Sequence, residues 1–278
     1  MSMRGLVLML SFICVNQVSA QGFKTCAEMG VYGGGSYYIG DLNRTRHFID
    51  SKLAGGLVFR YNLSTRHSMR FTANYGNVYA FDSDGKASDQ INRNLSFKSR
   101  IIELAAGFEV NLFKYRINDM KYPFTPYFFY QLAYARINPK AELNGNEVAL
   151  QPLGTEGQGT GIPGTKDRAY NLNQLTVPLG IGFKFNLRKR VAISIEYGIR
   201  KTFTDYLDDV SGNYVDADIL AASNGPLAAD MADRSINGMA TAGLNRGNSG
   251  NKDWYSFYGI MLTFKPFKRD ICDMRGWK

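Results

Sequence analysis

The sequence predicts an all-β protein, an eight-stranded antiparallel up-and-down transmembrane β-barrel. Eight stretches of about 12–17 residues alternate apolar with small or polar side chains, a period of two that is typical of strands. The segments that connect these stretches alternate between long and short, as they do in outer-membrane barrels. After the N-terminal leader, no apolar run approaches the roughly 20 residues of a transmembrane helix, and mean hydropathy is −0.24. These observations exclude a helical membrane protein.

The leader, residues 1–20, matches a secretory signal peptide. Arg4 supplies a positive start, Gly5–Val15 is an apolar run, and Val18–Ala20 is a cleavage site of small residues. The alternative is a buried N-terminal helix. We expect cleavage to leave residues 21–278 as one outer-membrane barrel, with four long extracellular loops and a short C-terminal periplasmic tail.

The first four strands each carry their large apolar side chains on one face. The fourth strand shows the alternation most clearly. In chain order, the apolar residues are Met29, Val31, Tyr37 and Ile39 in Ala27–Gly40; Leu53, Leu57, Phe59, Tyr61 and Leu63 in Lys52–Leu63; Met69, Phe71, Ala73 and Tyr75 in Ser68–Tyr79; and Ile102, Leu104, Ala106, Phe108, Val110 and Leu112 in Ser99–Phe113.

The last four strands repeat this pattern. Their apolar residues are Phe128, Tyr130, Leu132 and Tyr134 in Phe124–Ile137; Leu175, Val177, Leu179, Ile181, Phe183 and Phe185 in Asn171–Leu187; Val191, Ile193, Ile195, Tyr197 and Ile199 in Val191–Thr204; and Tyr258, Ile260, Leu262 and Phe264 in Asp253–Phe267. No helical pattern separates the strands, so parallel βαβ units are not expected.

The connections contain 11, 4, 19, 10, 33, 3 and 48 residues in order. An even number of strands places both chain ends on the side of the short turns, which is the periplasm in outer-membrane barrels. The alternative is a secreted soluble barrel, which would carry its apolar side chains inside. The longer loops are rich in Gly, Asn, Ala and Ser, and we expect Gly154–Gly164 and Ala221–Gly250 to be mobile.

Ionisable residues share the opposite face of the strands with the small residues. Eight strands enclose an interior that side chains just fill, and unpaired charges there are costly. We therefore expect a paired interior network that fixes strand register and leaves no open pore; a proton or ion path is the alternative. Its members are Glu28, Arg60, Arg70, Glu103, Glu109, Lys184, Glu196 and Arg200.

Two cysteines remain after the predicted cleavage. Cys26 precedes the first strand and Cys272 follows the last, and these strands are neighbours in a closed barrel. In an oxidising periplasm we expect a Cys26–Cys272 disulfide across the seam; two free thiols, or one thiol paired with a partner protein, are the alternatives.

Charge is divided between the two predicted faces. The periplasmic face carries 13 basic and 3 acidic residues, whereas the four long loops carry 11 basic and 16 acidic residues. A basic face can dock an acidic protein or contact anionic lipid headgroups. Nucleic acid does not fit the compartment. The predicted docking residues are Lys114, Arg116, Lys121, Arg188, Lys189, Arg190, Lys268 and Arg269.

Residues that could support catalysis are scarce. His47 and His67 fall on opposite sides of the predicted membrane, so they cannot share a catalytic site. Paired His or Cys at metal-binding spacing is absent, and Asp205–Asp218 lacks the spacing of a calcium loop, although loose surface calcium remains an alternative. We expect neither an enzyme, nor a cofactor, nor a structural metal.

Several segments together resemble the PorG-like outer-membrane barrels of the type IX secretion system, and the resemblance extends over nearly all of the mature chain. The most specific part is the run that starts at Arg200 and ends at Ser211. The segments are Glu28–Val31, Gly35–Asn43, Phe59–Asn62, Phe97–Leu104, Glu196–Ser211 and Lys252–Tyr255.

This resemblance implies a non-enzymatic component of protein secretion. PorG-like barrels are thought to anchor a periplasmic ring, made of the lipoprotein PorK and its partner PorN, to the outer membrane. The resemblance therefore favours protein docking by the basic face. A small porin-like solute or ion channel and a surface adhesin are the alternative functions.

The specific run falls at the outer end of the seventh strand, away from the proposed ring. Its residues either brace the last loop or contact another outer-membrane component of the secretion machinery. The motif residues are Arg200, Lys201, Thr202, Phe203, Asp205, Asp208 and Asp209.

Overall fold

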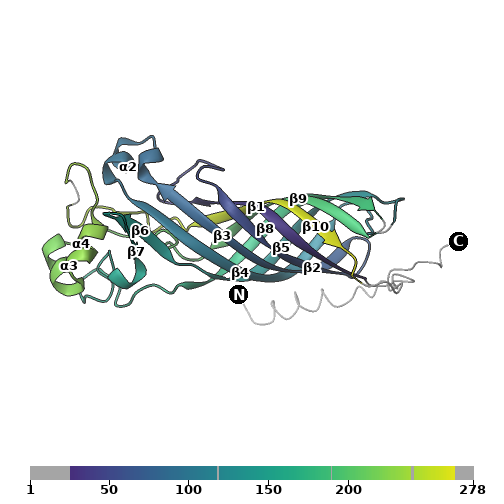
Figure 1. The fold of residues 1–278 in the computed structure, drawn as a ribbon. Helices are drawn as coiled ribbons and strands as arrows, with labels where there is room; N and C mark the ends of the chain where they lie inside the picture. Colours follow the sequence, from purple (N-terminus) through teal and green to yellow (C-terminus); the bar gives the residue numbers. More distant parts are fainter. Residues whose placement is uncertain (1–25, 118, 189, 239–240, 267–278) are drawn as a thin grey trace.

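The computed structural model describes residues 26–117, 119–188, 190–238 and 241–266, and these form a closed antiparallel barrel of eight strands (Figure 1). The predicted fold is confirmed. The barrel strands are β1 (Cys26–Ile39), β2 (Lys52–Asn62), β3 (His67–Phe81), β4 (Ser96–Asn111), β5 (Phe124–Arg136), β8 (Asn173–Arg188), β9 (Val191–Thr202) and β10 (Trp254–Phe264).

Each barrel strand pairs with its neighbours in the chain, and β10 pairs with β1 to close the sheet. Gly34 lies opposite Gly259 at this seam. Because the number of strands is even, β1 begins and β10 ends at the same end of the barrel, together with the short turns. We call this the turn end, and the opposite end, with the long connections, the loop end.

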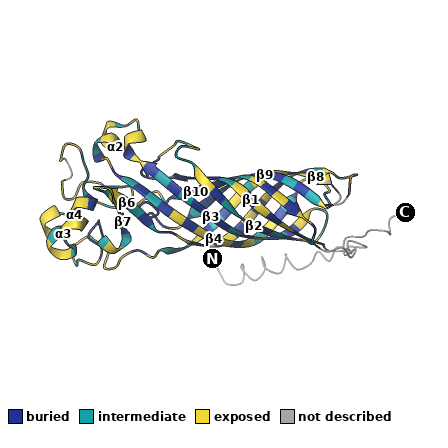
Figure 2. Ribbon diagram, in the orientation of Figure 1, coloured by how far each residue is buried: buried dark blue, intermediate teal, exposed yellow. Residues whose placement is uncertain are grey.

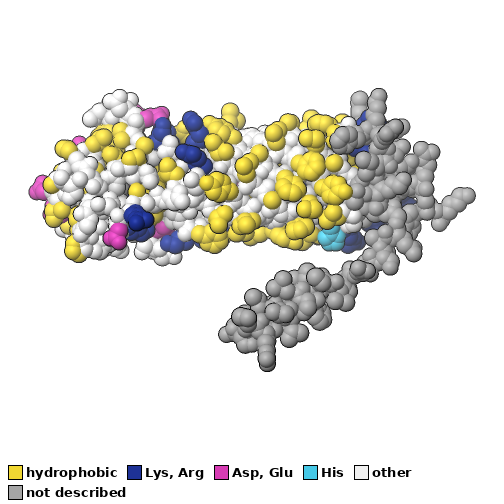
Figure 3. Space-filling model, turned by 90° about the horizontal axis from the view of Figure 1, so that it is seen from below, with side chains coloured by type: hydrophobic (Ala, Val, Ile, Leu, Met, Phe, Trp, Pro, Cys, Tyr) yellow, Lys and Arg dark blue, Asp and Glu magenta, His cyan; other side chains and the backbone are white. Residues whose placement is uncertain are grey.

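The outer wall is apolar. Leu104 is 60% exposed, Ile181 59% and Ile195 55%, whereas the inward-facing Glu103 is fully buried. Figure 2 shows this alternation of exposed and buried residues along the strands, and Figure 3 shows apolar side chains spread over the face of the wall that is in view. Apolar side chains outside and charged ones inside are the arrangement of a barrel whose solvent is lipid, not water.

An aromatic cluster covers the loop-end part of this wall over β1, β9 and β10. Phe48, in the loop after β1, packs against Tyr37, Tyr197 and Tyr258, with ring centroids 5.0–5.9 Å apart. The Tyr37 hydroxyl lies 2.6 Å from the Tyr197 hydroxyl and 2.9 Å from His47 Nδ1. The Tyr37 side chain points outward, as predicted, but it is completely buried because loop residues cover its ring.

The long connections contain secondary structure that the sequence analysis did not predict. A hairpin of β6 (Pro139–Leu143) and β7 (Asn146–Ala149) extends the sheet from β4 at the loop end. Its two-residue turn, Asn144-Gly145, has φ angles of 51° and 80°, the left-handed pair that a tight hairpin requires and that Asn-Gly adopts readily.

Short helices lie in the second and last long loops: α2 (Ser88–Arg93) in the second, and α3 (Ala217–Asn224) and α4 (Pro226–Ala232) in the last. Single 3-10 turns, η1 (Asp82–Asp84) and η2 (Gln151–Leu153), lie in the second and third loops. The Asp216 carboxylate caps α3 by accepting hydrogen bonds from two backbone N–H groups, and Pro226 occupies the first turn of α4. Both segments that we expected to be mobile, Gly154–Gly164 and Ala221–Gly250, take part in buried polar contacts described below, and the second includes α4 and the end of α3. Their mobility stays a prediction.

Among the residues that the structure describes, no helix has the length and apolar character that a membrane span requires. The predicted signal peptide, residues 1–20, lies outside the described residues. Cys26 is buried and forms no disulfide with another described residue, and its sulfur accepts a 3.3 Å hydrogen bond from Asn62 Nδ2. Cys272 also lies outside the described residues, so the Cys26–Cys272 disulfide stays a prediction.

Candidate functional site

The barrel interior holds all eight residues of the predicted network, each at most 8% exposed. Glu109 is the centre of the half nearer the turn end. Its carboxylate accepts hydrogen bonds from Arg60 Nε at 2.8 Å and Arg70 Nη1 at 3.1 Å, and it is paired with Lys184. One carboxylate on β4 thus contacts cations from β2, β3 and β8, which ties strands on different sides of the barrel together.

Further carboxylates balance these cations. Glu196 accepts two hydrogen bonds from Arg70, at 2.6 and 2.7 Å, in a bidentate arrangement, and a third from the Tyr127 hydroxyl. Glu28 lies 3.7 Å from Arg60 and accepts a hydrogen bond from Asn62. The guanidinium groups of the network pack on aromatic rings, so little of the cross-section is left without side chains.

The half nearer the loop end is built around Glu103. Arg200 Nε lies 3.3 Å from its carboxylate, and the Tyr255 hydroxyl and Asn74 Nδ2 donate to the same group. Arg200 belongs to both the predicted network and the predicted family motif, and the structure places it in the network. From there the motif continues out of the barrel into the last loop.

The motif forms the floor of a folded cap at the loop end. Residues Tyr206–Ser211 are all buried, which differs from a solvated acidic loop. Asp208 and Asp253 both accept hydrogen bonds from the Tyr38 hydroxyl, at 2.5 and 2.9 Å. Because Tyr38 lies near the loop end of β1, this hydroxyl connects the last loop to the first strand of the barrel.

Asp209 and Glu156 bind the third long loop to the last one. Asp209 accepts hydrogen bonds from the Thr155 and Tyr170 hydroxyls, at 2.6 and 2.7 Å. Arg246 donates to Glu156 at 3.0 Å and to the Asp209 carbonyl at 2.5 Å. Glu156 also accepts from the backbone N–H groups of Ser211 and Gly212. The motif therefore organises the cap through buried polar contacts.

The other motif residues lie at the base of the cap. Thr202 donates to the Asp253 carbonyl at 2.7 Å, and Lys201 Nζ lies 4.3 Å from the centre of the Trp254 ring. Phe203 is 63% exposed. Asp205 is 2% exposed, and its carboxylate has no hydrogen-bond partner that meets standard geometry among the described residues.

Burial is the main cause of the raised pKa values of the cap carboxylates. It raises the pKa of Asp209 to about 6, although the Arg246 guanidinium and two hydroxyl donors act in the opposite direction. Burial also raises the pKa of Asp208 well above the ordinary value, and the nearby carboxylates of Asp253 and Asp41 raise it further. These acids therefore hold their protons more tightly in the folded cap than in the unfolded chain.

We expect the cap to be more stable at pH 4.5 than at pH 7.5. A raised folded-state pKa contributes stability that is complete below the unfolded value, near pH 4, and that is lost as pH rises through the folded value, about 6 for Asp209. A tenfold difference in proton affinity between the folded and unfolded states corresponds to about 1.4 kcal/mol. Hydrogen exchange of the 205–211 amides in detergent-folded protein, corrected for the intrinsic pH dependence, measures this.

The variant Asp208→Asn should weaken that pH dependence, since a neutral amide oxygen still accepts from Tyr38. Asp230→Asn, on the exposed face of α4, is the matched control and should leave it unchanged. Amides that become better protected as pH rises would contradict this assignment.

At the turn end, the structure brings several of the predicted docking residues together. The Asn186 side chain on β8 donates to the carbonyls of Arg116 and Asp119, which fixes the β4–β5 turn beside the β8–β9 turn. Lys114, Lys121 and Arg190 are exposed, whereas Arg116 is half-buried and lies 4.0 Å from Asp119. Arg188 ends β8. Lys189, Lys268 and Arg269 lie outside the described residues.

Several residues of the cap were missed in the sequence analysis. Arg246 and Glu156 stand in loops without repeated spacing, whereas Tyr38 and Asp253 stand in predicted strands whose alternation says nothing about their contacts with the cap. No three His, Cys, Asp or Glu residues among those described lie close enough to hold a metal ion. His47 and His67 are far apart, at the loop end and the turn end.

The fold defines a small transmembrane β-barrel whose interior is filled and whose loop end is capped. The chain belongs to a family described as a domain of unknown function, DUF6089, whose model matches residues 3–150. No curated protein matches the chain.

Solved structures of similar architecture are distant in sequence. Neisserial surface protein A aligns with a TM-score of 0.42 and 9% identity, covering 86% of this chain and 96% of that one. OprG from Pseudomonas aeruginosa gives 0.40 and 12%, covering 88% and 99%. Ail of Yersinia pestis, in complex with the heparin analogue sucrose octasulfate, gives 0.39 and 9%, covering 87% and 99%. At this distance, the likenesses carry no argument about function.

Proposed function

We propose that this protein is a non-enzymatic outer-membrane anchor of a type IX protein secretion machinery. In this proposal the turn end faces the periplasm and binds an acidic surface of the PorK/PorN ring. The resemblance to PorG-like barrels supports the choice of machinery. The apolar wall supports the location, since a lipid bilayer is the solvent that such a surface requires.

The observation that carries the proposal is the exposed basic cluster at the turn end of a filled barrel. Lys114, Lys121 and Arg190 are exposed, and the structure shows no ion pair for them among the described residues. Such charges are available to a partner and would steer its approach and orientation. The interior supports an anchor over the porin alternative, because Arg60, Arg70 and Lys184 occupy the space that a solute would cross.

Reversing these charges should separate anchoring from folding. We expect Lys114→Glu/Lys121→Glu/Arg190→Glu to reduce co-purification of PorK and PorN with the tagged barrel by roughly tenfold, since like charges then oppose docking. Heat-modifiable mobility on SDS gels checks that the barrel still assembles.

Reversal of Lys86, Lys166 and Arg168, which are exposed at the loop end, is the matched control and should have no effect. Unchanged co-purification of PorK and PorN with the turn-end variant would show that this basic surface does not bind the ring. Stepwise conductance of the wild-type protein in planar bilayers would support the porin alternative instead.

A further inference from the structure

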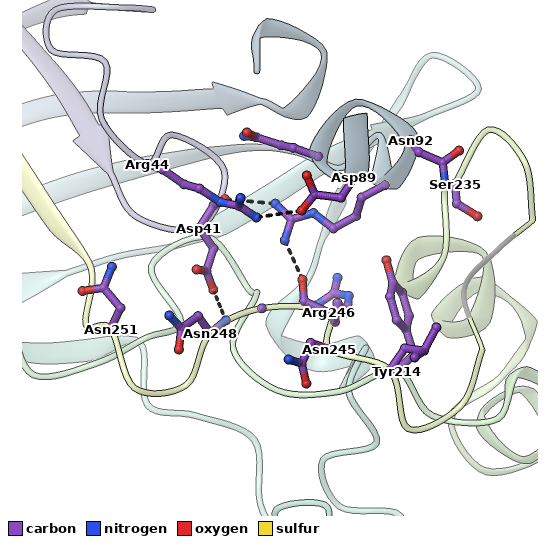
Figure 4. A pocket seen from close by; sticks show the side chains of 14 residues that line it. Asp41, Arg44, Asp89, Asn92, Tyr214, Ser235, Asn245, Arg246, Asn248 and Asn251 are labelled. Atoms are coloured by element: carbon purple, nitrogen blue, oxygen red, sulfur yellow. Dashed lines mark hydrogen bonds and ion pairs between the residues drawn. The ribbon is translucent and has the colours of Figure 1, made fainter. Parts of the chain in front are cut away.

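A recess opens in the cap at the loop end, between the loop after β1, helix α2 and the last loop (Figure 4). Its volume is about 780 Å³, within the range of about 300–1,000 Å³ that is usual for small-molecule sites. We call it the cap recess. Its wall residues come from three separate connections of the barrel, and neither the basic turn end nor the interior network contributes to it.

Each arginine that lines the cap recess already has an anionic partner, whereas the lining carboxylate of Asp41 accepts, among the described residues, only the Asn248 N–H, at 2.8 Å. Arg93 donates twice to the Asp82 carboxylate, at 2.7 Å each, and also to the carbonyl oxygens of Asp41 and Arg246. Arg44 lies 3.3 Å from Asp89 at the mouth. The recess therefore offers no buried cation that still needs an anion.

Two buried neutral atoms of the cap recess lack partners among the described residues. Asn92 Oδ1 and Ser235 Oγ are buried atoms without a hydrogen-bond partner in the described structure. They lie close together, since the Ile236 N–H donates to the Asn92 carbonyl at 3.0 Å. A buried acceptor and hydroxyl without partners cost free energy, which a ligand that pairs with them would recover.

Three more neutral groups line the cap recess. The carboxamides of Asn245 and Asn251 are exposed, and the Tyr214 hydroxyl adds a group that both donates and accepts (Figure 4). A carboxamide likewise donates and accepts at once, which matches the dual character of a hydroxyl on a ligand. The Tyr214 ring supplies an apolar surface beside these polar groups.

We propose that the cap recess binds a neutral saccharide. A saccharide is rich in hydroxyls and carries apolar ring faces, which match the neutral amide, hydroxyl and ring groups of this recess. An anionic ligand would leave its charge without an unpaired buried cation. A peptide would need a line of backbone partners, and the free groups of the recess are side-chain amides and hydroxyls.

Binding is tested with fluorescently labelled, detergent-folded full chain on a printed array of neutral and anionic glycans. We expect retention of a defined set of neutral glycans. Asn245→Ala/Asn251→Ala should lower that signal at least tenfold, and Tyr214→Phe should lower it to a smaller extent. These side chains make no hydrogen bond in the described structure, so the barrel should still fold, as heat-modifiable mobility on SDS gels will show.

Asn146→Ala, on the exposed hairpin strand β7, is the matched control and should bind like the wild type. The proposal is overturned if no neutral glycan is retained, or if the Asn245→Ala/Asn251→Ala variant binds as well as the wild type. Retention of anionic glycans alone, lost at high salt, would also overturn it and would point to the surface charges.

Discussion

Replacing Glu109 by alanine is expected to destabilise the folded barrel by about 3–5 kcal/mol, the typical cost of removing one partner from a buried ion pair. The Glu109 carboxylate faces Arg60, Arg70 and Lys184 in the interior. Without it, three cations share a low-dielectric space with too few anions. Urea unfolding in detergent micelles, followed by heat-modifiable mobility on SDS gels, measures the change in free energy of unfolding.

Two comparisons make this result specific to charge balance. Glu147→Ala breaks the partly exposed pairs of this hairpin carboxylate with Lys98 on β4 and Lys140 on β6, and it should leave stability unchanged within error. The double variant Glu109→Ala/Lys184→Met removes a cation together with the anion and should recover part of the loss. A Glu109→Ala barrel as stable as the wild type would show that the network does not hold the strands.

Replacing Gly34 by a larger residue is expected to prevent the seam between β1 and β10 from closing normally. A β-carbon on Gly34 would lie 2.6 Å from the Gly259 Cα and would also overlap the Tyr258 carbonyl oxygen, both of them backbone atoms. Overpacking of this kind costs about 1–3 kcal/mol for one added group, so Gly34→Ala should lower stability measurably. Gly34→Val should reduce the yield of folded barrel.

The neighbouring glycine provides the control. A β-carbon on Gly33 meets no atom within 4 Å, because this residue faces outward. Gly33→Ala should therefore fold with wild-type yield and stability in detergent. Equal effects at the two positions would contradict a steric origin and would indicate a general loss of glycine flexibility in the strand.

The barrel could be predicted because its physical constraint is repeated along the chain. Each strand must place apolar side chains toward lipid and small or charged ones toward the middle, so the same period of two appears eight times. Residues such as Leu104 and Glu103 could be assigned to opposite faces from spacing alone, and the structure places them there. The sorting of connections by length gave the topology in the same way.

The cap could not be predicted because its contacts are single, polar and distant in sequence. Asp209 meets Tyr170 and Arg246 across 39 and 37 residues, and Tyr38 meets Asp253 across 215. No periodic pattern reports such pairs. A Gly- and Asn-rich loop with scattered acids is typical of mobile, solvated chain, and only the burial of Asp208 and Asp209 distinguishes this one.

The basic face was predicted from composition, and its geometry only in part. Counting charges on the short connections identified Lys114 and Lys121 without any knowledge of how the turns pack. It did not separate them from Arg116, which is half-buried beside Asp119 and offers less to a partner. The exposure of a side chain in a turn depends on contacts between turns, such as the hydrogen bond from Asn186 to the Arg116 carbonyl. The spacing of residues along the sequence does not predict such contacts.

The aromatic cluster around Phe48 sets how deep the molecule sits in its surroundings. Tyrosine and phenylalanine rings prefer the boundary between hydrocarbon and headgroups, and here a loop residue extends down onto the wall to join them. Movement of the barrel along the membrane normal would transfer these rings from the interface into the hydrocarbon or into water. The cluster therefore fixes the depth of the barrel in the bilayer. The cap and its recess are thereby held at a constant distance from the lipid surface.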